Sequence, residues 1–331
     1  MVEPVCRAIP EPILKTGLKT RQPVAPCLFG RRRRLSLANC RPAGTAGIRQ
    51  TEPRCGMSEQ NQLNRAIADT GSVVVLTGAG CSTASGIPAY RDEHGEWMHS
   101  RPVQYADFVG SSEVRRRYWA RSYVGWQRVW RAKPNAAHRA LAALENRGTV
   151  QQIITQNVDD LHRDAGSERV IDLHGRLRVV VCLDCGERSS RDRLQDRLSE
   201  LNPNWSAARD DAAPDGDARI EDDAVQDFLI AGCEHCGGTL KPDVVFFGEN
   251  VPRERVEASH AAVAAADALL IVGSSLMVFS GFRFAREAHA LGKKLIIVNR
   301  GKTRADDLAD LKISIDCGTA LTALQEKLAT N

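Results

Sequence analysis

Two C-x-x-C pairs, separated by the 47 residues 186–232, constrain the fold of this chain more than any other feature; they are Cys182 and Cys185, then Cys233 and Cys236. Four thiolates at this spacing are typical of a tetrahedral zinc site, and because they fill every coordination position we expect a structural ion. Two redox-active sites are the alternative, but neither pair lies in a thioredoxin-like strand-helix-strand pattern. The pairs therefore predict a small zinc module, over about residues 176–241, too small for a core of its own.

The remaining composition bounds the class of protein. Ten cysteines in 331 residues are too few for a disulfide scaffold, and the tight pairs indicate thiols kept reduced. A content of 43% hydrophobic and 26% charged residues excludes overall disorder and predicts a globular chain. The longest apolar run, 268–279, is shorter than the roughly 18 residues of a membrane helix, so no membrane partner is expected.

Residues 1–56 form a leader that differs from the rest in charge and proline content. It holds 11 Lys and Arg against three Glu, a charge of +8, so the rest of the chain carries −4 of the total +4. That mildly acidic body argues against nucleic acid as a partner. Seven of the fourteen prolines lie in the leader and oppose an amphipathic helix. We interpret it as disordered, or as the product of a misplaced start with Met57 the true first residue; the alternative is an organelle-targeting peptide. The expected location is the cytoplasm, or the mitochondrial matrix if the leader is a transit peptide.

After the leader, helical and strand patterns alternate. Helical patterns cover residues 58–69, 134–147, 252–266 and 281–291. Short β-branched apolar runs, typical of buried strands, cover residues 73–76, 150–155, 268–272 and 294–298. This alternation predicts an α/β fold with a doubly wound parallel sheet, whose ligand sites lie at the carboxyl ends of the strands.

The first strand runs into a glycine turn within GAGCSTASGIPAYRD, residues 78–92. Gly78 and Gly80 would let a phosphate approach the backbone, and we expect a helix just beyond to offer its N-terminal N–H groups and dipole. The spacing is not G-x-G-x-x-G, so an ordinary tight turn stays open as the alternative. Arg91 can pair with a diphosphate or form a surface salt bridge.

Polar groups follow the later strands as well. Gln156, Asn157 and Asp159 suit a carboxamide and ribose hydroxyls, although helix capping by Asn157 explains that residue equally well. The turns 273–275 and 299–301 can complete a nucleotide site, because a hydroxyl turn holds phosphate and an amide holds a ribose.

His174, in DLHG, also follows a short predicted strand. A neutral imidazole there can act as a general base near neutral pH, whereas the alternative is a surface or core histidine without a catalytic role. Its position before a glycine at a strand end favours the base.

Taken in order, GAGCSTASGIPAYRD, TQNVD, DLHG, the C-x-x-C pairs, KPDVVFFGE, GSS and VNRG resemble the sirtuins, NAD-dependent protein-lysine deacylases, over about residues 63–328. YWARSYVGW, LNPNWSA, APDGD and TRADDLADLK more narrowly resemble the class II, sirtuin-four-like subgroup. The resemblance implies a catalytic domain over residues 57–331, a large Rossmann-type domain with the zinc module inserted. NAD and an acylated lysine of a protein substrate would meet in a cleft between the two.

The resemblance also assigns residues. His174 is implied as the catalytic base, which deprotonates a ribose hydroxyl while the acyl group passes to ADP-ribose and nicotinamide leaves. Implied NAD contacts are Gly78, Ala79, Gly80, Thr83, Ile87, Tyr90, Arg91, Gln156, Asn157, Val158, Asp159, Gly273, Ser274, Ser275, Asn299, Arg300, Gly301 and Cys317. One structural zinc is implied at Cys182, Cys185, Cys233 and Cys236.

Three further expectations concern the substrate. Phe246, Phe247 and Gly248 match the segment that pairs with substrate backbone as an added strand. Ala89 replaces the family's usual acidic residue, which puts the turnover rate in question more than NAD binding. The Tyr and Arg pair of class III enzymes has no match in YWARSYVGW, so succinyl-lysine is not the first expected substrate.

Three functions compete with deacetylation. Mono-ADP-ribosyl transfer and removal of longer acyl groups, as by a lipoamidase, are the enzymatic alternatives. An NAD-sensing binding module is the alternative from another class of protein, because motifs of this kind establish a fold more securely than an activity. The preferred acyl group, the target proteins and the oligomeric state are left open.

Overall fold

The computed structural model describes residues 57–98, 102–206 and 225–330. The predicted leader lies outside the described residues. Among the helices described, none combines the length and apolar character needed to cross a membrane.

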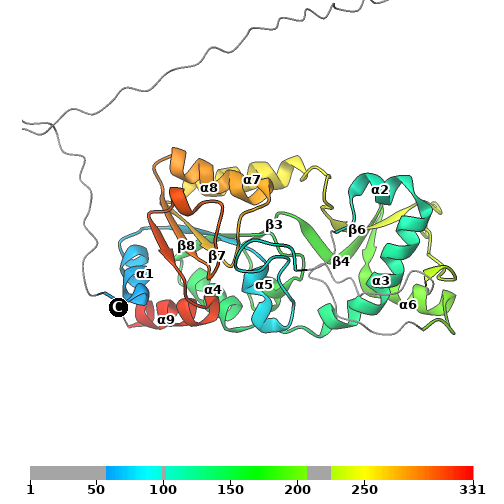
Figure 1. Ribbon diagram of the computed structural model, residues 1–331, viewed down its shortest axis with the longest axis horizontal. Helices are drawn as coiled ribbons and strands as arrows, with labels where there is room; N and C mark the ends of the chain where they lie inside the picture. Colours follow the sequence, from blue (N-terminus) through cyan, green and yellow to red (C-terminus); the bar gives the residue numbers. More distant parts are fainter. Residues whose placement is uncertain (1–56, 99–101, 207–224, 331) are drawn as a thin grey trace, which may run out of the picture. The chain divides into compact units, whose positions relative to one another are not determined.

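A six-stranded sheet forms the larger part of the described unit, and every neighbouring pair in it is parallel (Figure 1). The order is β3-β2-β1-β7-β8-β9. The strands are β1 (Val73–Thr77), β2 (Val150–Thr155), β3 (Val170–Asp172), β7 (Ala268–Val272), β8 (Lys294–Val298) and β9 (Leu311–Ile313). The predicted α/β fold with a doubly wound parallel sheet is confirmed.

Helices cover both faces of this sheet (Figure 1). On one face α1 (Glu59–Ala68), α4 (Ala136–Asn146) and α9 (Cys317–Ala329) pack against alternate strand residues such as Val73 and Val75. On the other face α7 (Arg253–Ala265) and α8 (Phe279–Ala290) pack against the intervening residues, such as Val74 and Leu76. Side chains alternate between the faces of a strand, so a strand covered on both sides must be apolar throughout.

The predicted helices are present, and their starts follow from capping. Ser58 Oγ accepts a hydrogen bond from the Asn61 N–H at the start of α1. Asn135 and His138 form a reciprocal capping box at the start of α4. Helix α8 begins at Phe279, two residues before the predicted start.

The helix expected just beyond the first glycine turn was a wrong prediction. Two single turns of 3-10 helix stand there instead, η1 (Ala79–Cys81) and η2 (Thr83–Ser85). Gly86 ends the second turn with φ of 85°, a left-handed conformation that stops a helix. The helix that follows this turn in the sequence is therefore too short to supply the expected dipole, and the backbone N–H groups of the turn are what it offers an anion.

A three-stranded antiparallel sheet of order β5-β4-β6 carries the cysteine pairs. It consists of β4 (Gly175–Cys182), β5 (Arg188–Ser190) and β6 (Leu240–Val244), with α6 (Arg191–Leu201) beside it. Helices α2 (Tyr105–Gly110) and α3 (Ser112–Arg131) share its hydrophobic core, which includes Phe108, Tyr118, Trp119 and Phe246. We call this sheet with α2, α3 and α6 the small lobe, and the six-stranded sheet with its helices the large lobe.

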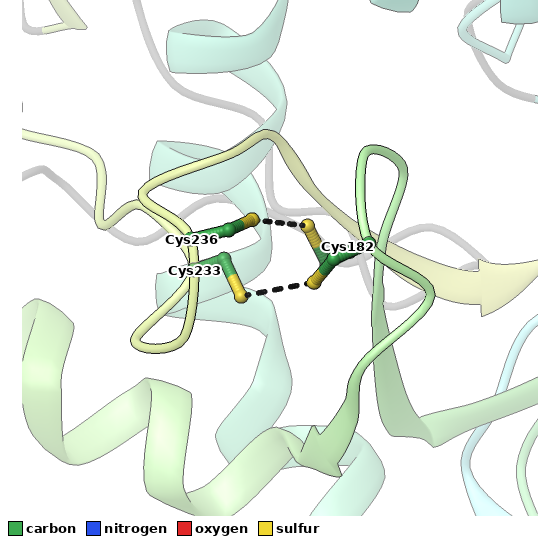
Figure 2. Close-up of side chains that lie close together, drawn as sticks. Cys182, Cys233 and Cys236 are labelled. Atoms are coloured by element: carbon green, nitrogen blue, oxygen red, sulfur yellow. Dashed lines mark hydrogen bonds between the residues drawn. The ribbon is translucent and has the colours of Figure 1, made fainter.

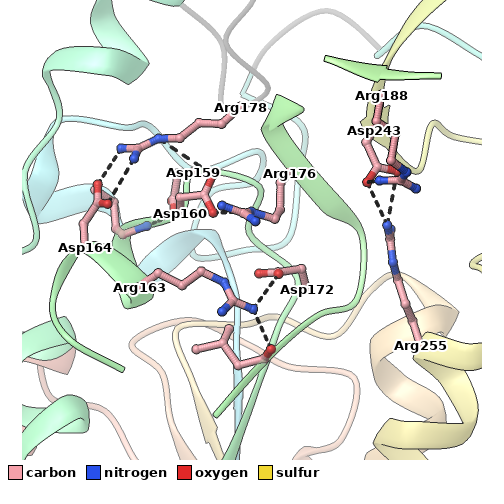
Figure 3. A network of polar contacts seen from close by, with 12 residues as sticks. Asp159, Asp160, Arg163, Asp164, Asp172, Arg176, Arg178, Arg188, Asp243 and Arg255 are labelled. Atoms are coloured by element: carbon pink, nitrogen blue, oxygen red, sulfur yellow. Dashed lines mark hydrogen bonds and ion pairs between the residues drawn. The ribbon is translucent and has the colours of Figure 1, made fainter. Parts of the chain in front are cut away.

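Ion pairs tie the two lobes together (Figure 3). Asp243 in β6 accepts hydrogen bonds from Arg188 of β5, at 2.7 Å, and from Arg255 of α7, at 3.0 Å. Asp160, just before the short helix α5 (Leu161–Asp164), is buried and accepts from Nε of Arg176 in β4. Both carboxylates therefore hold the small sheet against elements of the large lobe.

Candidate active site

A cavity of about 560 Å³ lies at the carboxyl ends of β1, β2, β7 and β8, with residues 244–251 of the small lobe on its wall. His174 lines it, together with all of the predicted NAD contacts except Ile87 and Asp159. The predicted residues on its wall are Gly78, Ala79, Gly80, Thr83, Tyr90, Arg91, Gln156, Asn157, Val158, Gly273, Ser274, Ser275, Asn299, Arg300, Gly301 and Cys317. Because the carboxyl ends of parallel strands meet at one edge of a sheet, groups up to 239 positions apart, from Gly78 to Cys317, line the same cavity.

The glycine turns after β1 and β7 touch each other across the floor of the cavity. The Gly80 N–H donates to the Gly273 carbonyl at 2.8 Å. A Cβ added to Gly78 would lie 2.7 Å from the Ser274 Cβ, and one on Gly80 would lie 2.9 Å from the Gly273 carbonyl oxygen. Glycine is required here by the approach of a neighbouring turn, before any ligand is considered.

Two amide side chains after β2 brace these turns. Nε2 of Gln156 donates to Ser274 Oγ at 2.8 Å and contacts the Thr77 carbonyl at 3.2 Å. Nδ2 of Asn157 donates to the Gly78 carbonyl and to Ser82 Oγ, each at 3.0 Å. Asn157 does not cap α5, so that alternative is wrong. The donors of both amides are used inside the protein.

Asp159 and Ile87 lie behind the cavity wall. Asp159 is buried, which raises the pKa of its carboxyl group, and it accepts from the Ser82 hydroxyl at 2.6 Å and from the Leu161 N–H at 3.0 Å. Ile87 is buried in a small apolar cluster with Leu161 and Ala132. Both residues support the glycine turn from behind.

A neutral polar cluster lies beneath the same turn. Cys81, His138 and His162 place their ligand-type atoms within 4.8 Å of one another, and all three are buried. Burial lowers the pKa of His138 to about 4 and that of His162 well below its ordinary value, and it raises the pKa of Cys81. The Asn135 N–H donates to His138 Nδ1 at 3.3 Å, and His162 Nε2 lies 2.9 Å from Thr77 Oγ1.

His174 has the geometry of a general base. Its Nδ1 lies 3.1 Å from the Gln156 carbonyl oxygen, which only accepts, so Nδ1 carries the proton of the neutral ring. Nε2 is then an acceptor, and it lies 2.8 Å from Ser280 Oγ in the first turn of α8. Burial, with smaller effects of Arg255 and Arg283, lowers the pKa of His174 to about 4. The imidazole is therefore neutral at physiological pH. The sequence analysis missed Ser280, since no motif connects it to His174.

An aromatic group closes one side of the cavity. The Trp97 ring lies 5.6 Å from Phe247 and 6.4 Å from Tyr90, centroid to centroid. The Arg91 guanidinium stacks 3.9 Å from the Trp97 ring centre and donates to the Gly95 carbonyl at 2.6 Å. Among the residues described, Arg91 forms no salt bridge, so that alternative is wrong for this residue.

The last turn, after β8, is held by its own side chains. Nδ2 of Asn299 donates to the Gly301 carbonyl at 2.9 Å. Arg300 and Asp316 form an exposed ion pair of 3.7 Å, and Cys317 follows at the start of α9. The turn is thereby preformed on the wall of the cavity.

The four paired cysteines meet in the small lobe (Figure 2). Their sulfur atoms all lie within 4.8 Å of one another, with Cys182 and Cys236 at 3.6 Å and Cys185 and Cys233 at 3.8 Å. A tetrahedral zinc ion with Zn–S bonds of about 2.3 Å requires sulfur separations of about 3.8 Å. Gly186 and Gly237, with φ of 76° and 73°, turn the backbone directly after each pair. The donor set and spacing fit the predicted zinc ion.

Comparison with known proteins gives one consistent result. Residues 78–280 match the family model described as the Sir2 family. An NAD-dependent protein deacetylase of Xanthomonas campestris pv. campestris is 55% identical over 252 residues, 76% of this chain and 86% of that protein. The protein of the same name from Bordetella bronchiseptica is 50% identical over 265 residues, 80% of this chain and 97% of that protein.

Solved structures agree with the sequence comparison. The structure titled "Sir2-p53 peptide-NAD+" has 29% sequence identity and a TM-score of 0.65, and the match covers 83% of this chain and all of that one. "Sir2 bound to acetylated peptide" matches with 28% identity, the same TM-score and the same coverage.

Proposed function

Because the chain belongs to the Sir2 family, we propose that it is an NAD-dependent protein-lysine deacylase, which transfers an acyl group from lysine to ADP-ribose and releases nicotinamide. One observation carries the proposal: a neutral imidazole, His174, lies on the wall of a cavity formed by the turns of four parallel strands. The curated relatives named above are NAD-dependent protein deacetylases, and acetyl-lysine is the first substrate to test.

His174 acts as the base in this proposal. Nδ1 keeps its proton because it faces the Gln156 carbonyl, so Nε2 is the acceptor and can take a proton from a ribose hydroxyl that displaces the hydroxyl of Ser280. A pKa of about 4 keeps this nitrogen unprotonated over the whole physiological range. The imidazolium that forms after proton transfer would be poorly stabilised in the resting site, which favours rapid return of the proton.

The chemistry that NAD supplies is a ribose carbon from which nicotinamide departs, making it an acceptor for the acyl oxygen. The protein's part is to hold the nucleotide. In the turns 78–80 and 273–275 the N–H groups of Gly78, Gly80 and Gly273 already donate to backbone carbonyls. The N–H groups of Ala79, Ser274 and Ser275 make no backbone hydrogen bond among the described residues and suit the diphosphate, and Asn299 suits the adenosine half. Asp159 and Ile87 contribute only by fixing the first turn.

The substrate is proposed to bind as an extended strand beside residues 246–249. The Phe247 carbonyl already accepts from the Tyr105 N–H at 2.8 Å, and the Phe246 N–H donates to Glu249 at 2.8 Å. Gly248 makes no backbone hydrogen bond in the described part of the chain. We therefore assign the pairing with substrate backbone chiefly to Gly248.

Two finer assignments are also proposed. The four motifs quoted above support the class II subgroup, and Ala89 marks a departure on the cavity wall. Residues 57–331 are proposed as the catalytic domain and residues 176–241 as its zinc module, with the leader dispensable for activity. Zinc in that module would hold the wall formed by residues 244–251 and take no part in chemistry.

The decisive experiment measures nicotinamide release from NAD by the zinc-loaded full-length chain, with and without acetyl-, lipoyl- and branched-acyl-lysine peptides. Release should depend on a peptide and should fall about 10³-fold or more in His174→Ala, whereas His289→Ala, on the exposed end of α8, should match wild type. Peptide-independent release that survives His174→Ala, with labelled protein as product, would establish ADP-ribosyl transfer instead.

A further inference from the structure

Arg283 lies on the wall of the cavity and has no anionic partner among the described residues. It belongs to α8, one turn beyond Ser280, and it is half-buried. Its Nε is buried and has no hydrogen-bond acceptor. Within residues 57–98, 102–206 and 225–330, its guanidinium forms no ion pair or hydrogen bond, and its one ring contact is with Phe279 at 5.4 Å.

Among the described residues, none of the four acidic residues on the cavity wall pairs with Arg283. Asp92 accepts from the N–H groups of its own loop, and the exposed Glu93 side chain lies 3.8 Å from His94. Glu249 pairs with Lys241 at 3.0 Å, and Asp316 accepts from the Thr319 N–H and pairs with Arg300. The other two arginines on the wall also have partners, since Arg91 bonds Gly95 and Arg300 pairs with Asp316. Arg283 is therefore a cation whose charge the described residues leave uncompensated.

An unpaired, partly desolvated guanidinium is costly unless a ligand satisfies it. Its planar fork of N–H donors matches a carboxylate in a two-point contact, and it stays charged at all relevant pH values. A carboxylate brought by the ligand would bind two of these donors together. The unpaired N–H donors of the Arg283 guanidinium are therefore best matched by a planar anion such as a carboxylate.

The position of Arg283 points to the acylated substrate as the source. Residues three apart on a helix share a face, so Arg283 lies on the side of α8 where Ser280 contacts His174. Helical side chains lean toward the N-terminus, and the contact with Phe279, whose ring is 50% exposed, places the guanidinium beside the open end of the cavity. The diphosphate has its own proposed donors, the backbone N–H groups of Ala79, Ser274 and Ser275, and does not require Arg283.

We propose that Arg283 binds a carboxylate of the acylated substrate and so makes acidic substrates preferred over neutral ones. The carboxylate has two possible carriers: an Asp or Glu beside the acyl-lysine, or the far end of a dicarboxylic acyl group. This inference rests on the proposed function, because it takes the cavity to hold an acyl-lysine.

Two isosteric peptide pairs test it on the full-length, zinc-loaded protein. The first pair carries acetyl-lysine flanked by Glu or by Gln at the same positions. The second carries glutaryl-lysine or its terminal carboxamide, both in the Gln-flanked peptide. Dissociation constants by fluorescence anisotropy, kcat/KM for peptide at saturating NAD, and KM for NAD are measured for wild type, Arg283→Gln, Arg283→Lys and Arg286→Gln. Arg286 is exposed on the same helix and serves as the matched control.

In wild type we expect the acidic member of one pair to bind about 10- to 100-fold tighter than its amide. That preference should fall to about twofold or less in Arg283→Gln, recover in part in Arg283→Lys and persist in Arg286→Gln. The pair that discriminates identifies the carrier of the carboxylate.

Three results overturn the inference: no preference in either pair, a preference that survives Arg283→Gln, or a raised KM for NAD in Arg283→Gln with both preferences intact. The last would assign Arg283 to a nucleotide phosphate. A binding preference without any deacylation would leave the inference standing and refute the proposed function.

Discussion

The two lobes are stabilised in different ways. In the large lobe every residue of β1 and β7 is buried, and the core comes from helices and strands that pack by simple alternation. In the small lobe β4 alternates between buried and half-buried residues, and its core depends on aromatic side chains from α3 and on four cysteines. Both lobes have a hydrophobic core, and we expect the small lobe to depend in addition on a metal ion held by its four cysteines.

Removing zinc should have the largest effect, because it should unfold the small lobe and leave the large lobe folded. The binding free energy of a structural zinc ion is on the order of 10 kcal/mol, so chelation or Cys182→Ala should unfold the small lobe and abolish deacylation. Hydrogen exchange should show lost protection in β4 and β6 with β1, β7 and β8 still protected. Cys317→Ser, which lies outside the cluster, should keep one zinc per chain. Equal loss of protection in both lobes would show that they fold as one unit.

Truncating one buried leucine in each lobe tests the same difference in zinc dependence. Leu270→Ala in β7 and Leu194→Ala in α6 each remove a buried side chain, at a cost of about 3 kcal/mol in free energy of unfolding. Urea denaturation should show the cost of Leu270→Ala with and without zinc, but that of Leu194→Ala only with zinc. If Leu194→Ala costs as much in the zinc-free protein, the small lobe does not depend on its metal.

Acid should weaken the large lobe through its buried histidines. Unfolded His138 binds a proton below about pH 6.5, but the folded protein binds one only below about pH 4. Stability is therefore fully present above pH 6.5 and is lost as the pH falls toward 4, by up to about 3 kcal/mol for this residue. His138→Gln should flatten that part of the stability curve between pH 7 and 5, measured by urea denaturation. His94→Gln, at an exposed histidine, should leave the slope unchanged.

The smallest expected effect lies between the lobes, at Ser280. Its hydroxyl donates to Nε2 of His174 and so favours the neutral ring. Ser280→Ala should raise the pKa of His174 from about 4 by less than about one unit. The acid limb of kcat/KM should move to higher pH by the same amount, with little change at pH 8. A shift toward lower pH would mean that the proton sits on Nε2.

Much of the large lobe could be predicted because each of its strands is marked by a short continuous run of apolar residues in the sequence. The runs 73–76, 150–155, 268–272 and 294–298 are continuous apolar segments that only a buried parallel sheet accommodates, and the groups at their ends must then meet. The helix expected after Gly80 does not form, and the second 3-10 turn in its place ends at Gly86, whose left-handed backbone conformation stops a helix.

The rest depends on contacts that no local pattern encodes. Trp119 packs on a sheet whose last strand lies more than 100 positions later in the chain, and its Nε1 donates to the Leu240 carbonyl. Ser280 and Arg283 lie on an ordinary amphipathic helix, and only the packing of α8 beside His174 brings them to the cavity wall. Such roles follow from tertiary structure rather than from spacing.

A bound nucleotide must compete with Ser280 for the side chain of His174. A ribose hydroxyl can reach Nε2 of His174 only by displacing the hydroxyl of Ser280, so one hydrogen bond is exchanged for another of the same kind. An even exchange adds little to ground-state affinity. In the absence of nucleotide, the serine keeps the base from activating a stray water molecule. We therefore expect Ser280→Ala to change the affinity for the nucleotide little.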